Sequence, residues 1–535
     1  MHPVRRVRKS CPLQQQRMLS SRPDLLLATL SAVGVAGLLS VLARALRVSR
    51  RRGLPAPPPG PRGIPLLGNL LDVSPVEPWL RFTEMGDKYG DITSLRILNR
   101  TLILVHSASA ADALLSAPAF APLTADRPAF PFAGALCGFD DALVLVPYGA
   151  RVRRERKMMH RMFGTPAAVA QWRPAVQAEI ARLLRALVRD PGRYVSEVGA
   201  TAGGISMRIA YGHELRRGGD ALFDALHVTA TSFVDATMPG AWMVDVFPIL
   251  RYWPSWLPGG GFHGAAAAIR QQVSDTVDLV FSHAKEKIAN GSAQTSFLST
   301  FLEEGGHTDY SLKWAAAVIH VGASDTTAAQ LEGFFLAMSL YPECQARAQA
   351  EIDEVVGRGR LPTMDDREQL PYTNALCKEV LRWFVSGPTG LPHTVKEEFV
   401  FSLHDGPPML IPKGVAIIPN VWAMHYDPRL YENPMEFDPA RYLGEAGRKV
   451  EEDPAGSISF GYGRRMCPGR FLADSTIFLA CSALLSVFQI KAGGDSKPVK
   501  RQSSQSVSHP LPFECSITLR DIHSDGLIPL EEPSS

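Results

Sequence analysis

The chain has 535 residues, of which 46% are hydrophobic and 20% charged, an ordinary composition for a folded enzyme with a large core. Residues 1–52 hold eleven Lys or Arg and one acid, so the other 483 residues carry 45 basic and 52 acidic side chains. This distribution argues against nucleic-acid binding, which usually shows as a basic folded domain. The seven cysteines form no C-x-x-C pair, which argues against a disulfide scaffold, a zinc finger and an iron–sulfur cluster.

The basic charge near the N-terminus flanks an apolar segment, residues 25–43, which is nineteen residues long and carries no charged side chain. A helix of this length reaches about 28 Å, close to the ~30 Å hydrocarbon core of a bilayer. We therefore expect a basic N-terminal segment over residues 1–24 and a single transmembrane helix over residues 25–43. A cleaved signal peptide is the alternative, disfavoured because the apolar run is longer than such peptides usually contain.

Charge alone does not orient this anchor, because six basic residues precede it and five follow it. Initiation of translation at Met18 would remove part of the preceding charge and favour a C-terminal domain on the cytosolic side. A mitochondrial presequence is a minority alternative, since the first 23 residues contain several Arg and Ser but no acid.

Residues 44–69 form a basic and proline-rich segment, and its six prolines predict an extended hinge. Residues 70–535 contain no second linker or repeat before a polar stretch at 493–508, which predicts one large domain. Apolar residues recur at helical spacing in the following segments: 167–188, 264–289, 312–340 and 373–384. Alternating stretches at 92–106 and 399–418 predict hairpins. The expected fold class is mainly α with a minor β region.

Three segments carry polar residues that core packing does not explain. Residues 322–327, Gly-Ala-Ser-Asp-Thr-Thr, lie in the middle of a long apolar helix; these residues weaken the helix, and their hydroxyls can bond back to the preceding turn and bend it. Glu379 and Arg382 are three residues apart in an apolar helix, which favours a buried ion pair. Arg441 follows a Phe-x-Pro turn. A solvated notch, an exposed pair and an ordinary loop arginine are the simpler alternatives for the three.

The stretch FGYGRRMCPGR, residues 460–470, sets one cysteine among glycines and arginines. A catalytic nucleophile needs a paired base, and no histidine lies near Cys467 in sequence, although a partner could come from elsewhere. A plain buried cysteine usually has apolar neighbours, unlike this one. A thiolate held by backbone amides at a helix start, with arginines nearby, better suits an axial ligand of a metal.

This stretch also matches F-x-x-G-x-R-x-C-x-G, the haem-binding signature of the cytochrome P-450 superfamily, at every fixed position, through Phe460, Gly463, Arg465, Cys467 and Gly469. Residues 322–327 resemble the A-G-x-D-T-T site of the family's central helix. Glu379 and Arg382 resemble its E-x-x-R pair, and residues 437–441 its F-x-P-x-R turn. The resemblance covers nearly the whole chain and is strongest to fungal members of secondary metabolism. It implies the cytochrome P-450 fold, preceded here by the single membrane helix.

The resemblance also implies roles for single residues. Cys467 would be the axial thiolate ligand of the iron of haem b, and Phe460 and Gly463 would belong to the haem-binding loop. Arg156, His393 and Arg465 match positions that meet the haem propionates. Asp325 and Thr326 match the acid and alcohol that deliver protons during oxygen activation. Glu379, Arg382 and Arg441 would form a structural cluster behind the haem.

The implied activity is that of a haem-thiolate monooxygenase, which inserts one atom of O₂ into a lipophilic small molecule, in secondary metabolism or xenobiotic oxidation. No strand-linked G-x-G-x-x-G and no flavin segment occurs, so electrons from NADPH are expected through a separate NADPH-cytochrome P-450 reductase, with cytochrome b5 as a further candidate partner. The expected location is the endoplasmic reticulum membrane, with the catalytic domain in the cytosol. A reductase-independent isomerase or peroxygenase and a non-enzymatic haem sensor or electron carrier are the alternatives.

Overall fold

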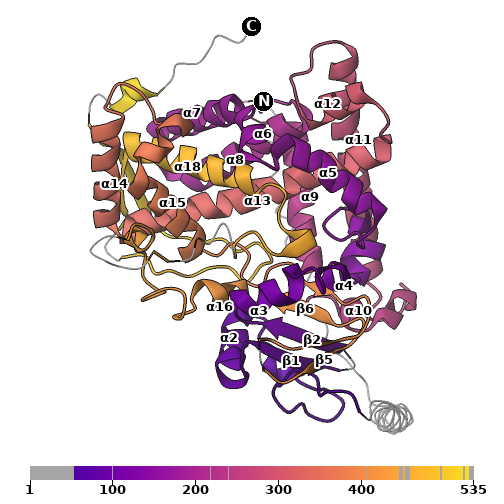
Figure 1. Ribbon diagram of the computed structural model, residues 1–535. Coiled ribbons are helices and arrows are strands. Elements are labelled where there is room, and N and C mark those ends of the chain that lie inside the picture. The colour runs from indigo at the N-terminus through magenta and orange to yellow at the C-terminus, as the bar shows by residue number, and fades with distance from the viewer. Residues whose placement is uncertain are drawn as a thin grey trace. The chain divides into compact units, whose positions relative to one another are not determined.

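The computed structural model describes most of the chain beyond residue 52 (Figure 1). The described residues are 53–98, 100–216, 219–238, 240–404, 406–444, 450–451, 453, 458–494, 497–521 and 524–528. The predicted membrane anchor over residues 25–43 lies outside them. Within the described residues, the only helix long and apolar enough to cross a membrane is α18, Arg470–Val487, and 78% of it is buried inside the protein.

Helices make up most of the structure, as the sequence predicts. The long helices are α2 (Pro78–Tyr89), α5 (Ala150–Phe163), α7 (Arg173–Arg189), α8 (Tyr194–Tyr211), α9 (Ala221–Thr237), α11 (Phe262–Ala289), α12 (Phe297–Glu304), α13 (Asp309–Leu340), α14 (Pro342–Val355), α15 (Pro371–Trp383) and α18. The short ones are α3 (Ala108–Ala111), α4 (Ala121–Thr124), α6 (Pro166–Ala170), α10 (Met243–Val246) and α16 (Val421–His425). Three of the four predicted helices appear as α11, α13 and α15, with ends shifted by at most three residues.

The predicted helix over residues 167–188 is wrong in one respect, because it is split into α6 and α7. The break falls at Gln171 and Trp172, where the indole of Trp172 donates instead to the carbonyl of Met162 at 2.8 Å. Pro174 then occupies the first turn of α7, where its missing N–H costs nothing. The apolar periodicity continues across the break, which is why the sequence reads as one helix.

The strands form three small sheets. The largest has the order β1 (Ile92–Ile97), β2 (Arg100–Val105), β6 (Ala416–Pro419) and β3 (His393–Thr394). The hairpin predicted over residues 92–106 is the antiparallel β1–β2 pair. The stretch 399–418 divides: β4 (Phe399–Phe401) and β5 (Met409–Ile411) form a hairpin, whereas β6 runs parallel to β2. The remaining pair is β7 (Phe488–Ala492) with β8 (Cys515–Leu519).

The proline-rich segment contains no helix over residues 53–63. Part of it is bound to the strands: Ser94 donates its amide to the carbonyl of Pro59 at 2.7 Å, and Leu410 donates to that of Ala56 at 2.9 Å. Residues 56–63 therefore belong to the same compact unit as residues 67–535.

Helix α13 lies at the centre of the helical part, with α8 and α18 beside it (Figure 1). Its close packing requires small residues: a Cβ on Gly333 would lie 2.5 Å from the ring of Phe384, which follows α15. The largest hydrophobic core combines side chains of α5, α7, α8, α13, α15 and α18. A long central helix in a close-packed core provides a rigid support for any group placed at its middle.

Candidate functional site

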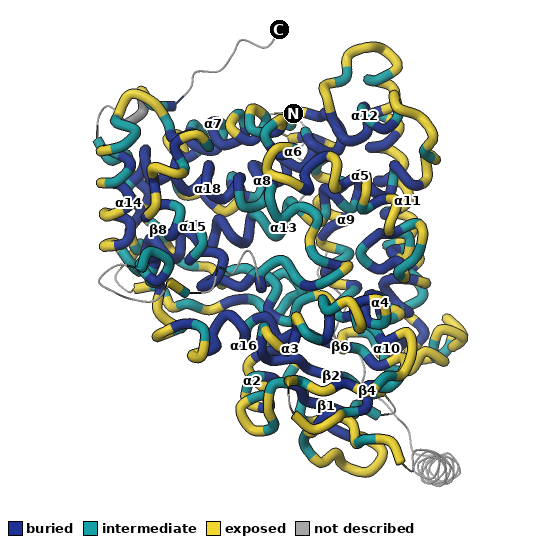
Figure 2. Tube along the Cα trace, viewed as in Figure 1, coloured by how far each residue is buried: buried dark blue, intermediate teal, exposed yellow. Residues whose placement is uncertain are grey.

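The middle of α13 is less buried than the segments on either side of it. Residues 314–317 and 328–339 are buried, whereas residues 321–327 are partly exposed (Figure 2). Thr326 donates its hydroxyl to the carbonyl of Gly322 at 2.8 Å, one turn earlier, as such hydroxyls do in helices. The helix nevertheless stays continuous from Asp309 to Leu340, so the predicted weak segment is a polar notch in an unbroken helix.

The Cys467 loop folds back on itself through its backbone. The amide of Cys467 donates to the carbonyl of Phe460 at 2.8 Å, across the short 3₁₀ turn Gly463–Arg465. Helix α18 begins three residues later, at Arg470. The cysteine therefore lies just before a helix N-terminus, where backbone N–H groups favour negative charge.

Cys467 is an exposed residue in a loop whose members Tyr462 and Arg465 are buried. Burial raises the pKa of its thiol, while a hydrogen bond from the Gly469 amide and the charges of Arg156 and Arg470 oppose that rise. The sulfur is therefore accessible to a further group although the fold surrounds much of it. The other described cysteines, which are buried or half-buried, lack this combination.

Three arginines near this loop form a cluster with an excess of positive charge. Burial, and then the charges of Arg465 and Arg156, lower the pKa of Arg127 to about 9. Burial, and then the charge of Arg156, lower the pKa of Arg465 to about 10. Burial also lowers the pKa of Arg156. Asp126 is the acid that opposes these shifts for Arg127 and Arg465, whereas Cys467 and Tyr148 oppose the shift of Arg156.

Backbone carbonyls hold these arginines in place. Arg465 donates from Nε to Ala125 and from Nη2 to Val146, both at 2.7 Å. Arg156, on α5, donates to the carbonyl of Met466, next to the cysteine. Arg127 donates to three carbonyls, the shortest bond being 2.7 Å to Pro392. A guanidinium has five N–H donors, so each arginine keeps donors for another acceptor. The cluster is chemically suited to bind an anion with two carboxylates.

His393 lies close to Arg127 and Arg465, and its ring is neutral. Its Nδ1 lies 2.8 Å from the carbonyl oxygen of Thr124, which fixes the proton on that nitrogen. Burial, and then the charge of Arg127, lower the pKa of His393 to about 3. Its Nε2 is thus the atom available to a further group, and an incoming carboxylate would raise its pKa by pairing with the charged form.

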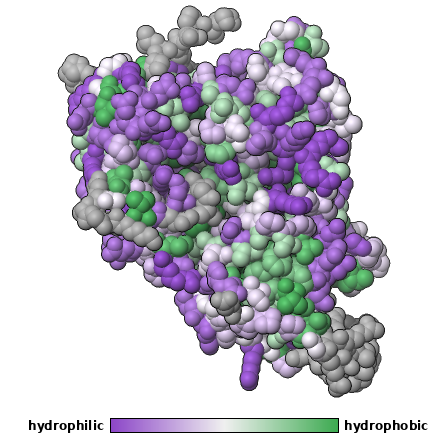
Figure 3. Space-filling view, viewed as in Figure 1, coloured by the Kyte–Doolittle hydropathy of each residue, from purple (hydrophilic) through white to green (hydrophobic). Residues whose placement is uncertain are grey.

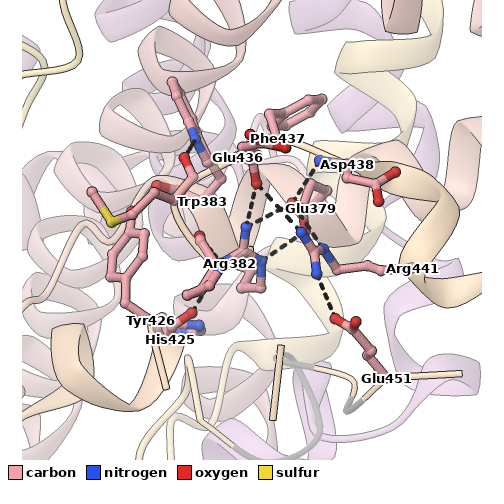
Figure 4. Close-up of polar contacts among 12 residues, drawn as sticks. Glu379, Arg382, Trp383, His425, Tyr426, Glu436, Phe437, Asp438, Arg441 and Glu451 are labelled. Atoms are coloured by element: carbon pink, nitrogen blue, oxygen red, sulfur yellow. Dashed lines mark hydrogen bonds and ion pairs between the residues drawn. The ribbon is translucent and has the colours of Figure 1, made fainter. Parts of the chain in front are cut away.

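Glu379 joins two arginines from different parts of the chain (Figure 4). Arg382 binds it through two parallel bonds, from Nη2 to Oε1 at 2.7 Å and from Nε to Oε2 at 2.8 Å. Arg441 donates from Nε to Oε1 at 3.1 Å. All three side chains are fully buried. The predicted buried ion pair is therefore present, and the turn predicted at Arg441 completes it.

The remaining donors of this cluster are also used. Arg382 donates to the carbonyls of His425, Pro434 and Glu436 at 2.7–2.9 Å. Burial disfavours the charged form of Arg382, but the effect of the Glu379 carboxylate is larger, so the pKa of Arg382 is raised. Arg441 pairs with Glu451, so two arginines face two carboxylates. The cluster ties α15 to the loop of residues 425–451, as expected of a structural element.

The backbone conformation at position 463 requires a glycine. Its φ is +56°, and a Cβ there would lie 2.0 Å from the carbonyl oxygen of Leu115. The close approach at Gly463 is thus to the chain's own backbone. The neighbouring Gly461 also has positive φ, at +75°, but nothing lies within 4 Å of its Cβ position.

Replacing Gly463 with alanine is expected to destabilise the loop by about 2–5 kcal/mol, combining the left-handed conformation with the overpacking against Leu115. The midpoint of urea unfolding measures this loss. Gly461→Ala is the matched control, with an expected cost of about 1–2 kcal/mol from conformation alone. Equal losses in the two variants would show that contact with Leu115 does not matter.

The partner of Asp325 was missed by sequence reasoning. His509, in the segment between β7 and β8, has its Nε2 3.1 Å from Oδ1 of Asp325. Its Nδ1 lies 3.0 Å from Oε2 of Glu332, further along α13. Because 184 positions separate Asp325 and His509, no local pattern in the sequence links them.

Comparison with known proteins agrees with this geometry. Residues 58–517 match the family Cytochrome P450. The chain is 39% identical to cytochrome P450 monooxygenase claR of Ampulloclitocybe clavipes, over 96% of this chain and 95% of that protein. It is 38% identical to cytochrome P450 monooxygenase 208 of Postia placenta, over 95% and 98% of the two chains. A third relative, cytochrome P450 monooxygenase ppsD of Aspergillus oryzae, is 34% identical over 88% and 90%. The chain belongs to the cytochrome P450 family and is a cytochrome P450 monooxygenase.

Proposed function

We propose that haem b binds beside the Cys467 loop and the notch of α13, where the Cys467 thiolate would ligate the iron. The observation that carries this proposal is the exposed Cys467 beside Arg156 and Arg465, since the iron at the centre of the group requires a thiolate and the propionates at its edge require cations. Arg156, Arg465 and His393 would hold the propionates. When bound, the haem supplies an iron that activates O₂ for transfer of one oxygen atom.

In this proposal Asp325 and Thr326 hold and move the protons that oxygen activation consumes. Both lie in the partly exposed notch of α13. The hydroxyl of Thr326 donates to the Gly322 carbonyl, and its oxygen can still accept a bond from water or another donor. The Asp325 carboxylate, held by His509, is the neighbouring acid. Their positions on a rigid helix keep a proton source at a fixed place.

Replacing Thr326 with alanine is expected to uncouple the reaction: NADPH consumption continues, while less product and more hydrogen peroxide form. Replacing Asp325 with asparagine is expected to lower turnover by about 10²-fold or more, the range for a lost general acid. With added reductase, product formed per NADPH consumed measures the first effect and the rate of product formation measures the second. Thr327→Ala, at the adjacent hydroxyl, serves as the control. Full coupling in Thr326→Ala would contradict the role of this hydroxyl.

We infer that the substrate is a lipophilic small molecule. Aromatic side chains gather around the segment of residues 130–145: Phe132 stacks on Trp242, with ring centroids 3.5 Å apart, and Phe139 meets Phe233 of α9 edge to face. These rings belong to a buried apolar cluster, and a substrate that binds beside this cluster needs few polar groups. The fungal origin of the relatives favours secondary metabolism over general xenobiotic oxidation.

Electrons are proposed to come from NADPH through a separate reductase, with cytochrome b5 as a second donor. Arg153, Arg154 and Lys157 are exposed along α5, the helix that also carries Arg156 toward the cysteine loop. A basic face at this place suits an acidic flavoprotein. A screen of lipophilic compounds with the protein, reductase, NADPH and ¹⁸O₂ tests the function; turnover without NADPH would instead favour an isomerase or peroxygenase.

Anchoring in the endoplasmic reticulum membrane remains a proposal that rests on residues 25–43. Apolar side chains gather on one face over the region of β2 and β6 (Figure 3). Among the large apolar residues that the structure describes, the most exposed are Leu71, Ile249, Trp256 and Val499, each above 70%. Exposed apolar side chains of this kind favour contact with a membrane or another apolar partner.

A further inference from the structure

His509 bridges two carboxylates on the same face of α13. Asp325 and Glu332 are seven residues apart, two helical turns, and therefore lie one above the other about 10 Å along the axis. The imidazole lies between them, with Nε2 toward Asp325 and Nδ1 toward Glu332. The side chain of Glu332 is 8% exposed and that of Asp325 is 29% exposed. The bridge thus runs from a buried acid to the acid in the notch.

The segment that carries His509 is fixed by its own hydrogen bonds. The His509 carbonyl accepts from the Ser503 amide at 2.8 Å, and the His509 amide donates to the Ser503 hydroxyl at 3.1 Å. The neighbouring Ser508 is fully buried and donates its amide to the carbonyl of Ser386, after α15. These bonds hold the backbone on both sides of the ring, so the imidazole is positioned by the fold and not by its two acids alone.

The surroundings favour the charged form of the ring. Burial opposes the charge of His509, but hydrogen bonds to Asp325 and Glu332 prevail and raise its pKa to about 10. Tyr194, from α8, lies close enough to Glu332 that this carboxylate contributes to raising its pKa. Burial raises the pKa of Cys515, on β8, to about 11. Both groups are neutral at pH 7, so the imidazolium faces two carboxylates and no competing cation among these neighbours.

We propose that His509 is a positioning residue that supplies protons to Asp325. Glu332 keeps the proton on Nδ1 and orients the ring, as the buried acid does in other acid–histidine pairs. The Nε2–H bond breaks as an O–H bond forms on the Asp325 carboxylate, which leaves the ring neutral. Water then returns a proton to Nε2, because the His509 side chain is 24% exposed. This step rests on the proton-delivery role proposed above for Asp325.

The first test compares His509→Gln with His227→Gln, an exposed histidine on α9 that serves as the control. The probe is 7-ethoxycoumarin, with reductase and NADPH. His509→Gln is expected to lower product per NADPH by about tenfold, less than loss of the acid itself, with KM unchanged and a larger solvent isotope effect. Normal coupling in His509→Gln with impaired Asp325→Asn would overturn the relay alone. Normal coupling in Asp325→Asn would overturn the proposed role of Asp325 and the relay with it.

The second test uses Glu332→Gln, which keeps an acceptor for Nδ1–H but removes the charge that raises the pKa of His509. In this variant we expect the product formed per NADPH to be near the parent level at pH 6. It should fall as the pH rises above about 7, because the ring loses its second proton nearer its ordinary pKa. A loss of coupling that is the same at every pH would indicate a structural role and overturn the proposal. This variant decides the question even where His509→Gln does not fold.

Thermal unfolding gives a readout without turnover. A histidine whose pKa is raised in the folded state contributes stability that is full below its unfolded pKa of about 6.5 and is lost as the pH rises through about 10. The difference in Tm between the parent and His509→Gln is therefore expected to be largest at pH 6 and to shrink toward pH 10. A difference that does not change with pH would show that the ring is not held as an imidazolium.

Discussion

Replacing Cys467 with serine is expected to abolish the Soret band that the reduced carbon monoxide complex shows with thiolate ligation. The amide of residue 467 would still donate to the Phe460 carbonyl, so the loop keeps its shape while the donor atom changes from sulfur to oxygen. A serine hydroxyl does not ionise in this setting, and the electron donation that favours O–O cleavage is lost. Turnover should fall below 1% of the parent, more than about 2.7 kcal/mol of transition-state stabilisation.

Cys515→Ser is the matched control for this change. Cys515 is half-buried and makes a weak contact with the Ser339 hydroxyl at 3.5 Å, so a serine can replace it at small cost. This variant should keep the thiolate-type band. Persistence of the thiolate-type band in Cys467→Ser would show that another residue ligates the iron.

Amphipathic helices were the part of the fold that the sequence predicted well. In α11 one face is buried and the other exposed, so its apolar residues recur every three to four positions. Helix α8 gave no such signal because it is buried on nearly all sides, and α18 is likewise buried along most of its length. The parallel pairing of β6 with β2 was missed for a different reason: it joins strands more than 300 residues apart, and alternation reveals a strand but not its partner.

The residues of the candidate site likewise divide into those that the sequence predicted and those that it missed. Glu379 and Arg382 could be paired in advance because three residues on a helix place two side chains on one face. Cys467 and its arginines were found through a short, dense motif. The bridge from Asp325 through His509 to Glu332 depends on how the β7–β8 segment packs against α13, and tertiary packing of this kind leaves no mark at fixed spacing. The contact of Gly463 with Leu115 could not be predicted for the same reason, since Leu115 is distant in sequence.

Replacing Arg382 with methionine is expected to have the largest effect on stability. Methionine keeps much of the side-chain volume, so the loss comes from polar groups and not from a cavity. The change removes the bidentate partner of Glu379 and the donors to the carbonyls of His425, Pro434 and Glu436. Breaking a buried pair by removing one partner costs about 3–5 kcal/mol, because the remaining charge stays buried.

The midpoint of urea unfolding and the yield of haem-loaded protein both measure this effect. Arg81→Met is the matched control, because Arg81 pairs with Glu84 at the same three-residue spacing on α2, but with side chains 49% and 62% exposed. Its expected cost is below about 0.5 kcal/mol. Equal losses in the two variants would contradict the structural role assigned to the cluster.

A second substitution, at Glu379, separates the contribution of the ion pair to stability from that of the hydrogen bonds that Arg382 donates to backbone carbonyls. Hydrophobic replacement of a whole buried ion pair is often neutral when no other groups depend on it. Here Glu379 also accepts from the amide of Asp438, at 2.9 Å, and from the hydroxyl of Tyr442, at 3.1 Å. The double variant Glu379→Gln, Arg382→Met should therefore recover only part of the stability lost in Arg382→Met. Full recovery would show that the Glu379 charge left without Arg382 accounts for the entire loss, and that the carbonyls of His425, Pro434 and Glu436 find other donors.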